Sequence, residues 1–227
     1  QADLVALGLG GALLHVLNHS LFKSLLFFAA GNVLHATGTR QISSLGGLAR
    51  TMPRTSVLFV VGAIAICGLP PLNGFAGELL LYLGLLRSVA GDASSGWPWA
   101  SLAVPALALI GALAVAGFVK VMGIAFGGIP RSSAAAQAHD PGRGMLAPMG
   151  VLALACLVLG LVPSVALPLT SHAIAAWNLD PASSPPPLSE LVPFASISGA
   201  GFVLVALAAL VAALVRRLPT APVTVVT

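Results

Sequence analysis

Three ionisable side chains follow one another along a single apolar stretch near the start of the chain. His15, His19 and Lys23 are spaced four residues apart, which stacks them along one face of an α-helix. Imidazole changes charge near neutral pH and offers both a donor and an acceptor nitrogen, so such a column can pass a proton. The spacing therefore predicts a proton relay. The alternative is that the same residues hold the helix to its neighbours by hydrogen bonds.

A second group of residues interrupts the next apolar stretch. Pro70 and Pro71 remove two backbone donors, and Asn73 with Gly74 is typical of a turn, so the helix is expected to open over residues 69–74. At membrane depth such a break survives only where it is buried in protein or lines a wet cavity. Glu78 lies in roughly the first turn after the break, which predicts an ion or proton site there. The alternative is a proline kink that serves packing alone.

Lys120 is the other basic residue expected inside an apolar stretch. A charge at the bilayer centre costs about 2.5 to 3.5 kcal/mol and normally marks a transport path. Lys120 lies six residues before Phe126, about 9 Å from that expected helix end, so its long stem can also reach the interface. A role in proton transfer and simple snorkelling remain equal alternatives for this residue.

The elements that must position these side chains are set by composition. The 227 residues are 58% apolar and only 7% charged, with a mean hydropathy of +1.02. That charge cannot coat a water-soluble globule, so we expect an integral membrane protein. The net charge of +4 does not indicate nucleic acid as a partner, because the arginines are scattered singly except for Arg216 and Arg217.

About 20 apolar residues cross the roughly 30 Å hydrocarbon layer as a helix. We therefore predict an all-α, polytopic transmembrane helix bundle of about five spans, the second discontinuous at Pro70–Gly74. The expected spans are residues 4–34, 55–89, 99–126, 146–171 and 197–215. Residues 1–227 are expected to form a single membrane domain. Because the chain starts at Gln1 within an apolar region, it is expected to be part of a longer protein.

Basic residues outside the spans predict the orientation, because cytoplasmic loops collect Lys and Arg. If the spans alternate, Arg87 is alone on one side. The other side holds Arg40, Arg50, Arg54, Arg131, Arg143, Arg216 and Arg217. Loops 37–54 and 127–145 and the C-terminus are therefore expected on the cytoplasmic side of the plasma membrane.

The wording of the sequence around these residues resembles a known family. LNHSLFKSLLF at 17–27 and LPPLNGF at 69–75 are similar to the later half of the antiporter-like, proton-conducting subunits of respiratory complexes. These include chains L, M and N of NADH-quinone oxidoreductase, the large subunits of multisubunit sodium/proton antiporters, and component B of hydrogenase-4 and formate hydrogenlyase. The resemblance is specific over residues 12–90, weaker to about residue 131, and most similar to the hydrogenase-4 branch.

The resemblance implies a role for each matched position. His15, His19 and Lys23 would form the relay of the outlet half of a proton path, and Glu78 would be the terminal site on the broken helix. Some members have Lys at that last position, whereas chain M and hydrogenase-4 component B have the acid found here. The family's first half, with its own broken helix and Glu/Lys pair, has no counterpart in this sequence.

The resulting expectation is a proton-translocating membrane subunit of a respiratory or hydrogenase-type complex, with other membrane subunits as partners. No cofactor is expected in this chain, because phosphate loops, catalytic triads, haem pairs and Cys/His metal spacing are absent from the sequence. One alternative is a sodium/proton antiporter subunit in which Glu78 and opened carbonyls coordinate sodium. The other is a membrane anchor whose polar residues only hold helices together.

Overall fold

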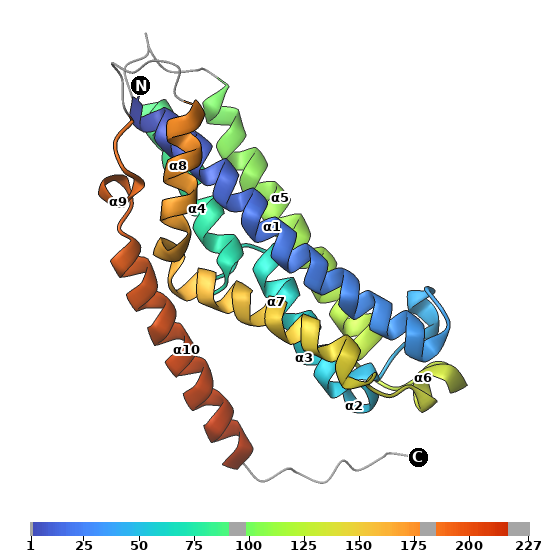
Figure 1. The fold of residues 1–227 in the computed structure, drawn as a ribbon. Coiled ribbons are helices and arrows are strands. Elements are labelled where there is room, and N and C mark those ends of the chain that lie inside the picture. Colours follow the sequence, from blue (N-terminus) through green and yellow to red (C-terminus); the bar gives the residue numbers. More distant parts are fainter. Residues whose placement is uncertain (1, 91–98, 178–184, 218–227) are drawn as a thin grey trace.

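The computed structural model describes residues 2–90, 99–177 and 185–217, and every regular element in these ranges is helical (Figure 1). The order is α1 (Ala2–Thr37), η1 (Ile42–Ser44), α2 (Leu48–Thr51), α3 (Pro53–Ile66), α4 (Asn73–Ala90), α5 (Ala100–Val121), η2 (Met122–Phe126), α6 (Ser133–Gln137), α7 (Arg143–Leu161), η3 (Pro163–Ala166), α8 (Leu167–Trp177), α9 (Leu188–Leu191) and α10 (Phe194–Arg217). The expected all-α architecture is confirmed. The connection 91–98 and the C-terminal residues 218–227 lie outside the described ranges.

Helix α1 is the longest element and organises the bundle. At 1.5 Å per residue its 36 residues extend about 54 Å, more than an untilted span requires. Helices α3, α4 and α7 all pack against it. The face of α1 that they cover carries two fully buried amides, Asn18 and Asn32, among apolar residues.

The second predicted span is discontinuous, as expected. Helix α3 ends at Ile66 and α4 begins at Asn73. Within the described ranges, four helices are long and apolar enough to cross a membrane: α1, α5 with its π-helical continuation η2, α7 and α10. The fifth predicted span is supplied by α3 and α4 together, which confirms a multi-pass helical bundle.

The fourth expected span is not one helix. Helix α7 ends at Leu161, and the chain turns through η3 into α8, which runs in a different direction (Figure 1). Val162 adopts φ −132° and ψ 67° because the ring of Pro163 disfavours a helical conformation in the residue before it. The prediction of an unbroken stretch over residues 146–171 was therefore wrong, although Pro163 marks the interruption in the sequence.

The two basic connections lie at the same end of the molecule, where α2 and α6 are side by side (Figure 1). The amide of Gly47 donates a 2.7 Å hydrogen bond to the carbonyl of Gly127, and the hydroxyl of Ser132 donates to the carbonyl of Ser44 at 2.9 Å. Arg87, in the last turn of α4, instead donates to the carbonyl of Leu191 near α9. The bundle thus separates Arg87 from the other loop arginines, as the alternating spans require.

Candidate functional site

The break between α3 and α4 is formed by glycines in close backbone contact. Gly68 has a φ of +63°, a conformation that residues with a Cβ rarely adopt. Its amide donates to the carbonyl of Ala65 at 3.1 Å. Gly74 packs against the same carbonyl so closely that a Cβ has no room. The ends of the two half-helices are therefore held together across the break.

Helix α7 covers the break from another side. Gly160 lies directly against the carbonyl of Pro71 and the backbone of Leu72, leaving no space for a side chain at position 160. Leu72 and Cys156 also pack with Phe22 and Ala65 in one buried apolar cluster. The irregular backbone of the break is thus enclosed by protein, which is the condition for an open helix at membrane depth.

Two buried asparagines join the break to α1. The side-chain nitrogen of Asn18 donates a 2.7 Å hydrogen bond to the carbonyl of Asn73. In return, the side-chain nitrogen of Asn73 donates to Oδ1 of Asn18 at 3.2 Å and to its carbonyl at 3.4 Å. Both residues are 0% exposed. This pair fixes the start of α4 against the middle of α1.

The carboxyl group of Glu78 is directed back at the break. A Cβ added at Gly68 would lie 2.7 Å from Cδ of Glu78, so the carboxyl group rests on the bare α-carbon of that glycine. Glu78 is half-buried, and its side chain has no hydrogen bond or ion pair with another described residue. A titratable group is thus placed at the opening between the two half-helices.

The predicted column on α1 is formed over its first two members. The ring centroids of His15 and His19 are 5.8 Å apart. His15 is half-buried, whereas His19 is exposed on the surface of the described chain. Lys23 is half-buried, and its Nζ lies 5.4 Å from the ring centroid of Phe27, one turn further along.

The structure brings His15 close to the residue preceding Glu78. A Cβ added at Gly77 would lie 3.1 Å from both the nitrogen and the α-carbon of His15, so α1 and α4 touch backbone to backbone there. In addition, Nδ1 of His15 and Oδ1 of Asn73 are buried without a hydrogen-bond partner in the described structure. Buried polar atoms of this kind normally bind a partner such as ordered water.

Lys120 is not brought to this site. It lies in the last turn of α5, exposed, and its side chain makes no hydrogen bond or ion pair with a described residue. Its position near the end of α5, just before η2, leaves the two alternatives for this lysine as they stood. Pro70 is exposed and Pro71 half-buried, so both line the outer side of the break.

A second polar network was not predicted from the sequence. The carboxylate of Asp140 accepts hydrogen bonds from the amides of Arg54 and Thr55 at 2.9 and 3.0 Å, and from the Thr55 hydroxyl at 2.8 Å. The side-chain nitrogen of Asn32 donates to the same hydroxyl at 3.4 Å and to Sδ of Met149 at 3.0 Å. The network ties α1, α3 and α7 together, and the amide at position 32 of an apolar helix is the signal that marks it.

Metal binding has no candidate site among the described residues, because no three His, Cys, Asp or Glu side chains are grouped to hold an ion. The chemistry available at the break is therefore that of imidazole, ammonium and carboxyl groups beside opened backbone carbonyls. Such groups can bind, hold and release protons, or coordinate a small cation.

Comparison with known proteins gives relatives for this arrangement. Residues 4–96 match the family described as "NADH:quinone oxidoreductase/Mrp antiporter, TM". The chain is 41% identical to formate hydrogenlyase subunit 3 of Escherichia coli over 81% of its length, and 37% identical to hydrogenase-4 component B of the same organism over 84%. It spans only 30% and 28% of the lengths of these two relatives.

A solved structure shares the fold. The Mrp complex of Dietzia sp. DQ12-45-1b contains a chain that matches 78% of this one with a TM-score of 0.60 and 25% identity, and 39% of that chain is covered. Antiporter relatives also appear in sequence, among them the A component of the Na(+)/H(+) antiporter of Bacillus subtilis, 35% identical over 68% of this chain and 19% of its own length. The chain belongs to the family of antiporter-like membrane subunits found in NADH:quinone oxidoreductases, hydrogenase-type complexes and Mrp antiporters.

Proposed function

We propose that this chain is the later part of a proton-translocating membrane subunit of a respiratory or hydrogenase-type complex. Protons pass along His15, His19 and Lys23 on α1 and reach Glu78 on the broken helix. The subunit itself binds no cofactor, and redox energy released in partner subunits shifts the proton affinities of Lys23 and Glu78. The relatives named for formate hydrogenlyase and hydrogenase-4 support this class of complex.

The observation that carries the proposal is the contact between α1 and α4. The backbone of His15 rests on Gly77, with no side chain between them, so the inner end of the column reaches the residue next to Glu78. The unpartnered Nδ1 of His15 and Oδ1 of Asn73 lie at the same crossing. Each can accept or donate a hydrogen bond to water, and a water chain there would join imidazole to carboxyl.

The exposure of His19 supports a site completed by further protein. An exposed imidazole at membrane depth would otherwise face lipid, where polar side chains are strongly disfavoured. The chain covers less than a third of its formate hydrogenlyase relative. The remaining length of such a protein can cover the column and supply the inlet half of the path.

We further propose that the shared end of the 37–54 and 127–145 connections faces the cytoplasm, together with the C-terminus, in the plasma membrane. The arginines gathered at this end support that orientation. Other membrane subunits are the expected partners, since the similar solved chain belongs to a multisubunit Mrp complex.

The proposal is tested with the full-length protein assembled in its complex in sealed vesicles. We expect the Lys23→Ala, Glu78→Gln double variant to assemble normally but to lose proton translocation. Unchanged translocation with unchanged assembly would contradict the proposal and favour a purely structural role for these residues. The amount of assembled complex is measured in the same vesicles, so that loss of assembly is not mistaken for loss of transport.

A sodium/proton antiporter subunit is the second candidate function. It is favoured by the likeness to the Bacillus subtilis antiporter component and to the Mrp structure. Glu78 beside the opened carbonyls of the break offers oxygen ligands suited to a small hard cation. Proton movement in the same vesicles that is indifferent to sodium argues against exchange, whereas sodium-dependent proton movement without a redox substrate supports it.

A further inference from the structure

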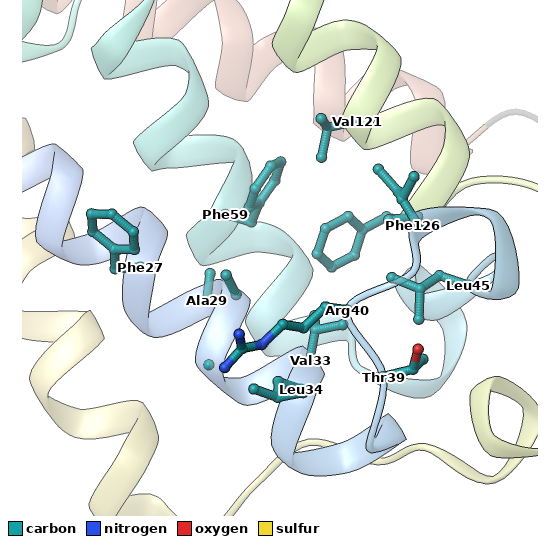
Figure 2. A pocket seen from close by; sticks show the side chains of 14 residues that line it. Phe27, Ala29, Val33, Leu34, Thr39, Arg40, Leu45, Phe59, Val121 and Phe126 are labelled. Atoms are coloured by element: carbon teal, nitrogen blue, oxygen red, sulfur yellow. The ribbon is translucent and has the colours of Figure 1, made fainter.

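A cavity of about 500 Å³ lies at the loop-rich end of the bundle, away from the break. It is bounded by the second half of α1, by Phe59 of α3, and by the end of α5 with η2. Nearly all of its lining is apolar, and Figure 2 shows Phe27 and Phe126 on opposite sides of it. A pocket of this size is large enough for a ligand of drug or lipid-chain size.

One charged side chain enters this apolar space. Arg40 comes from the connection between α1 and η1, and Figure 2 shows its guanidinium reaching along the cavity toward Leu34. In the described structure its side chain has no hydrogen bond or ion pair, so its donors are free for a ligand. Thr39 adds a hydroxyl to the same rim.

The cavity is formed by rigid walls and has room along α1. The rings of Phe59 and Phe126 are 4.9 Å apart and close one side. On the opposite side, Gly31 lines the cavity, and a Cβ added there would meet no atom within 4 Å. The open space therefore continues up to the backbone of α1.

We propose that this cavity binds an anionic phospholipid, with an acyl chain between α1 and η2 and the phosphate on the guanidinium of Arg40. The lining commits to this chemistry, because an apolar space with one unpaired cation at its rim is complementary to an amphiphile with an anionic head. Basic pockets between membrane helices near the interface recognise lipid head groups in this way, and arginine pairs with phosphate through two parallel hydrogen bonds. The proposal is independent of proton translocation.

The test uses the full-length protein in lipid discs containing equal amounts of phosphatidylglycerol and phosphatidylcholine. After transfer to detergent, retained lipids are counted by native mass spectrometry. We expect phosphatidylglycerol to be retained in preference to phosphatidylcholine. Arg40→Gln should lower the retained phosphatidylglycerol about fivefold, whereas Arg50→Gln, which removes an arginine that does not line the cavity, should leave it unchanged.

A second pair of variants tests the apolar part. Gly31→Leu fills the cavity and should remove both lipids, whereas Gly8→Leu, at another open glycine of α1, should remove neither. Should Gly31→Leu prevent folding, the arginine pair alone decides. Equal retention of the two lipids, or an Arg40→Gln protein that binds like the wild type, would overturn the proposal. So would a Gly31→Cys thiol that a lipid-soluble maleimide cannot reach after delipidation, because polypeptide would then occupy the space.

Discussion

Asn18 and Asn73 are hydrogen-bonded to each other through their side chains and backbone, and this pair locks the broken helix onto the helix that carries the histidines. The 2.7 Å bond from Asn18 to the carbonyl of Asn73 is the shortest of the three. Asn73 is the first residue of α4, so its position sets the direction in which Glu78 leaves the break. Proton transfer at Glu78 therefore depends on a contact made by residues that do not themselves titrate.

The Asn18–Asn73 pair is expected to couple energetically. Asn18→Ala leaves the carbonyl of Asn73 without its side-chain donor in a buried setting, which costs about 1 to 3 kcal/mol. A double-mutant cycle of Asn18→Ala and Asn73→Ala, followed by thermal unfolding of the full-length protein in detergent, should give a coupling of about 0.5 to 3 kcal/mol. Strictly additive effects would show that the two amides act independently.

Gly68 is expected to control the position of the Glu78 carboxyl group. Gly68→Ala strains a backbone at φ +63° and also displaces the carboxyl group that rests on its α-carbon. Gly38→Ala is the matched control, since Gly38 has φ +67° and open space around it. Both variants should lose about 1 to 2 kcal/mol of stability.

Only Gly68→Ala should also lower proton translocation per assembled complex, because only there does the new methyl group meet Glu78. Translocation is measured in sealed vesicles and divided by the amount of assembled protein. Equal translocation by the Gly68 and Gly38 variants would mean that the contact with Gly68 is irrelevant to the site.

Asp140 is expected to stabilise the start of α3 from a distance in sequence. Its carboxylate accepts hydrogen bonds from two amides at the N-terminus of that helix, at 2.9 and 3.0 Å, and removing such a cap costs about 0.5 to 2 kcal/mol. Asp140→Ala should therefore lower the melting temperature. Asp140→Asn keeps one acceptor oxygen and should fall between it and the wild type. An Asp140→Ala protein as stable as the wild type would rule out capping as its role.

The helix break was predictable from the sequence because its cause is local. Pro70 and Pro71 remove backbone donors wherever they occur in a helix, and the structure interrupts the helix between Ile66 and Asn73. The spacing of His15 and His19 likewise follows from helical periodicity alone. The turn at Val162 has an equally local cause in Pro163, but the continuous apolar pattern around it concealed the interruption.

The contacts that hold the site together were not predictable in the same way. Asn18 and Asn73 are separated by 55 residues, and no periodic pattern states which buried amide will meet which carbonyl. The cap from Asp140 to α3 depends on two loops meeting at one end of the bundle. The exposure of His19 and Lys120 also follows from how helices pack, which the residue types alone leave open.

The most direct test of the account is the initial rate of proton translocation by the assembled complex with Glu78→Gln. Glutamine keeps the size and hydrogen-bonding capacity of the side chain but cannot exchange a proton at neutral pH. The account predicts a rate lower by about tenfold or more with normal assembly, whereas the exposed Glu190→Gln control should translocate like the wild type. A Glu78→Gln complex that assembles and translocates at the wild-type rate would contradict it.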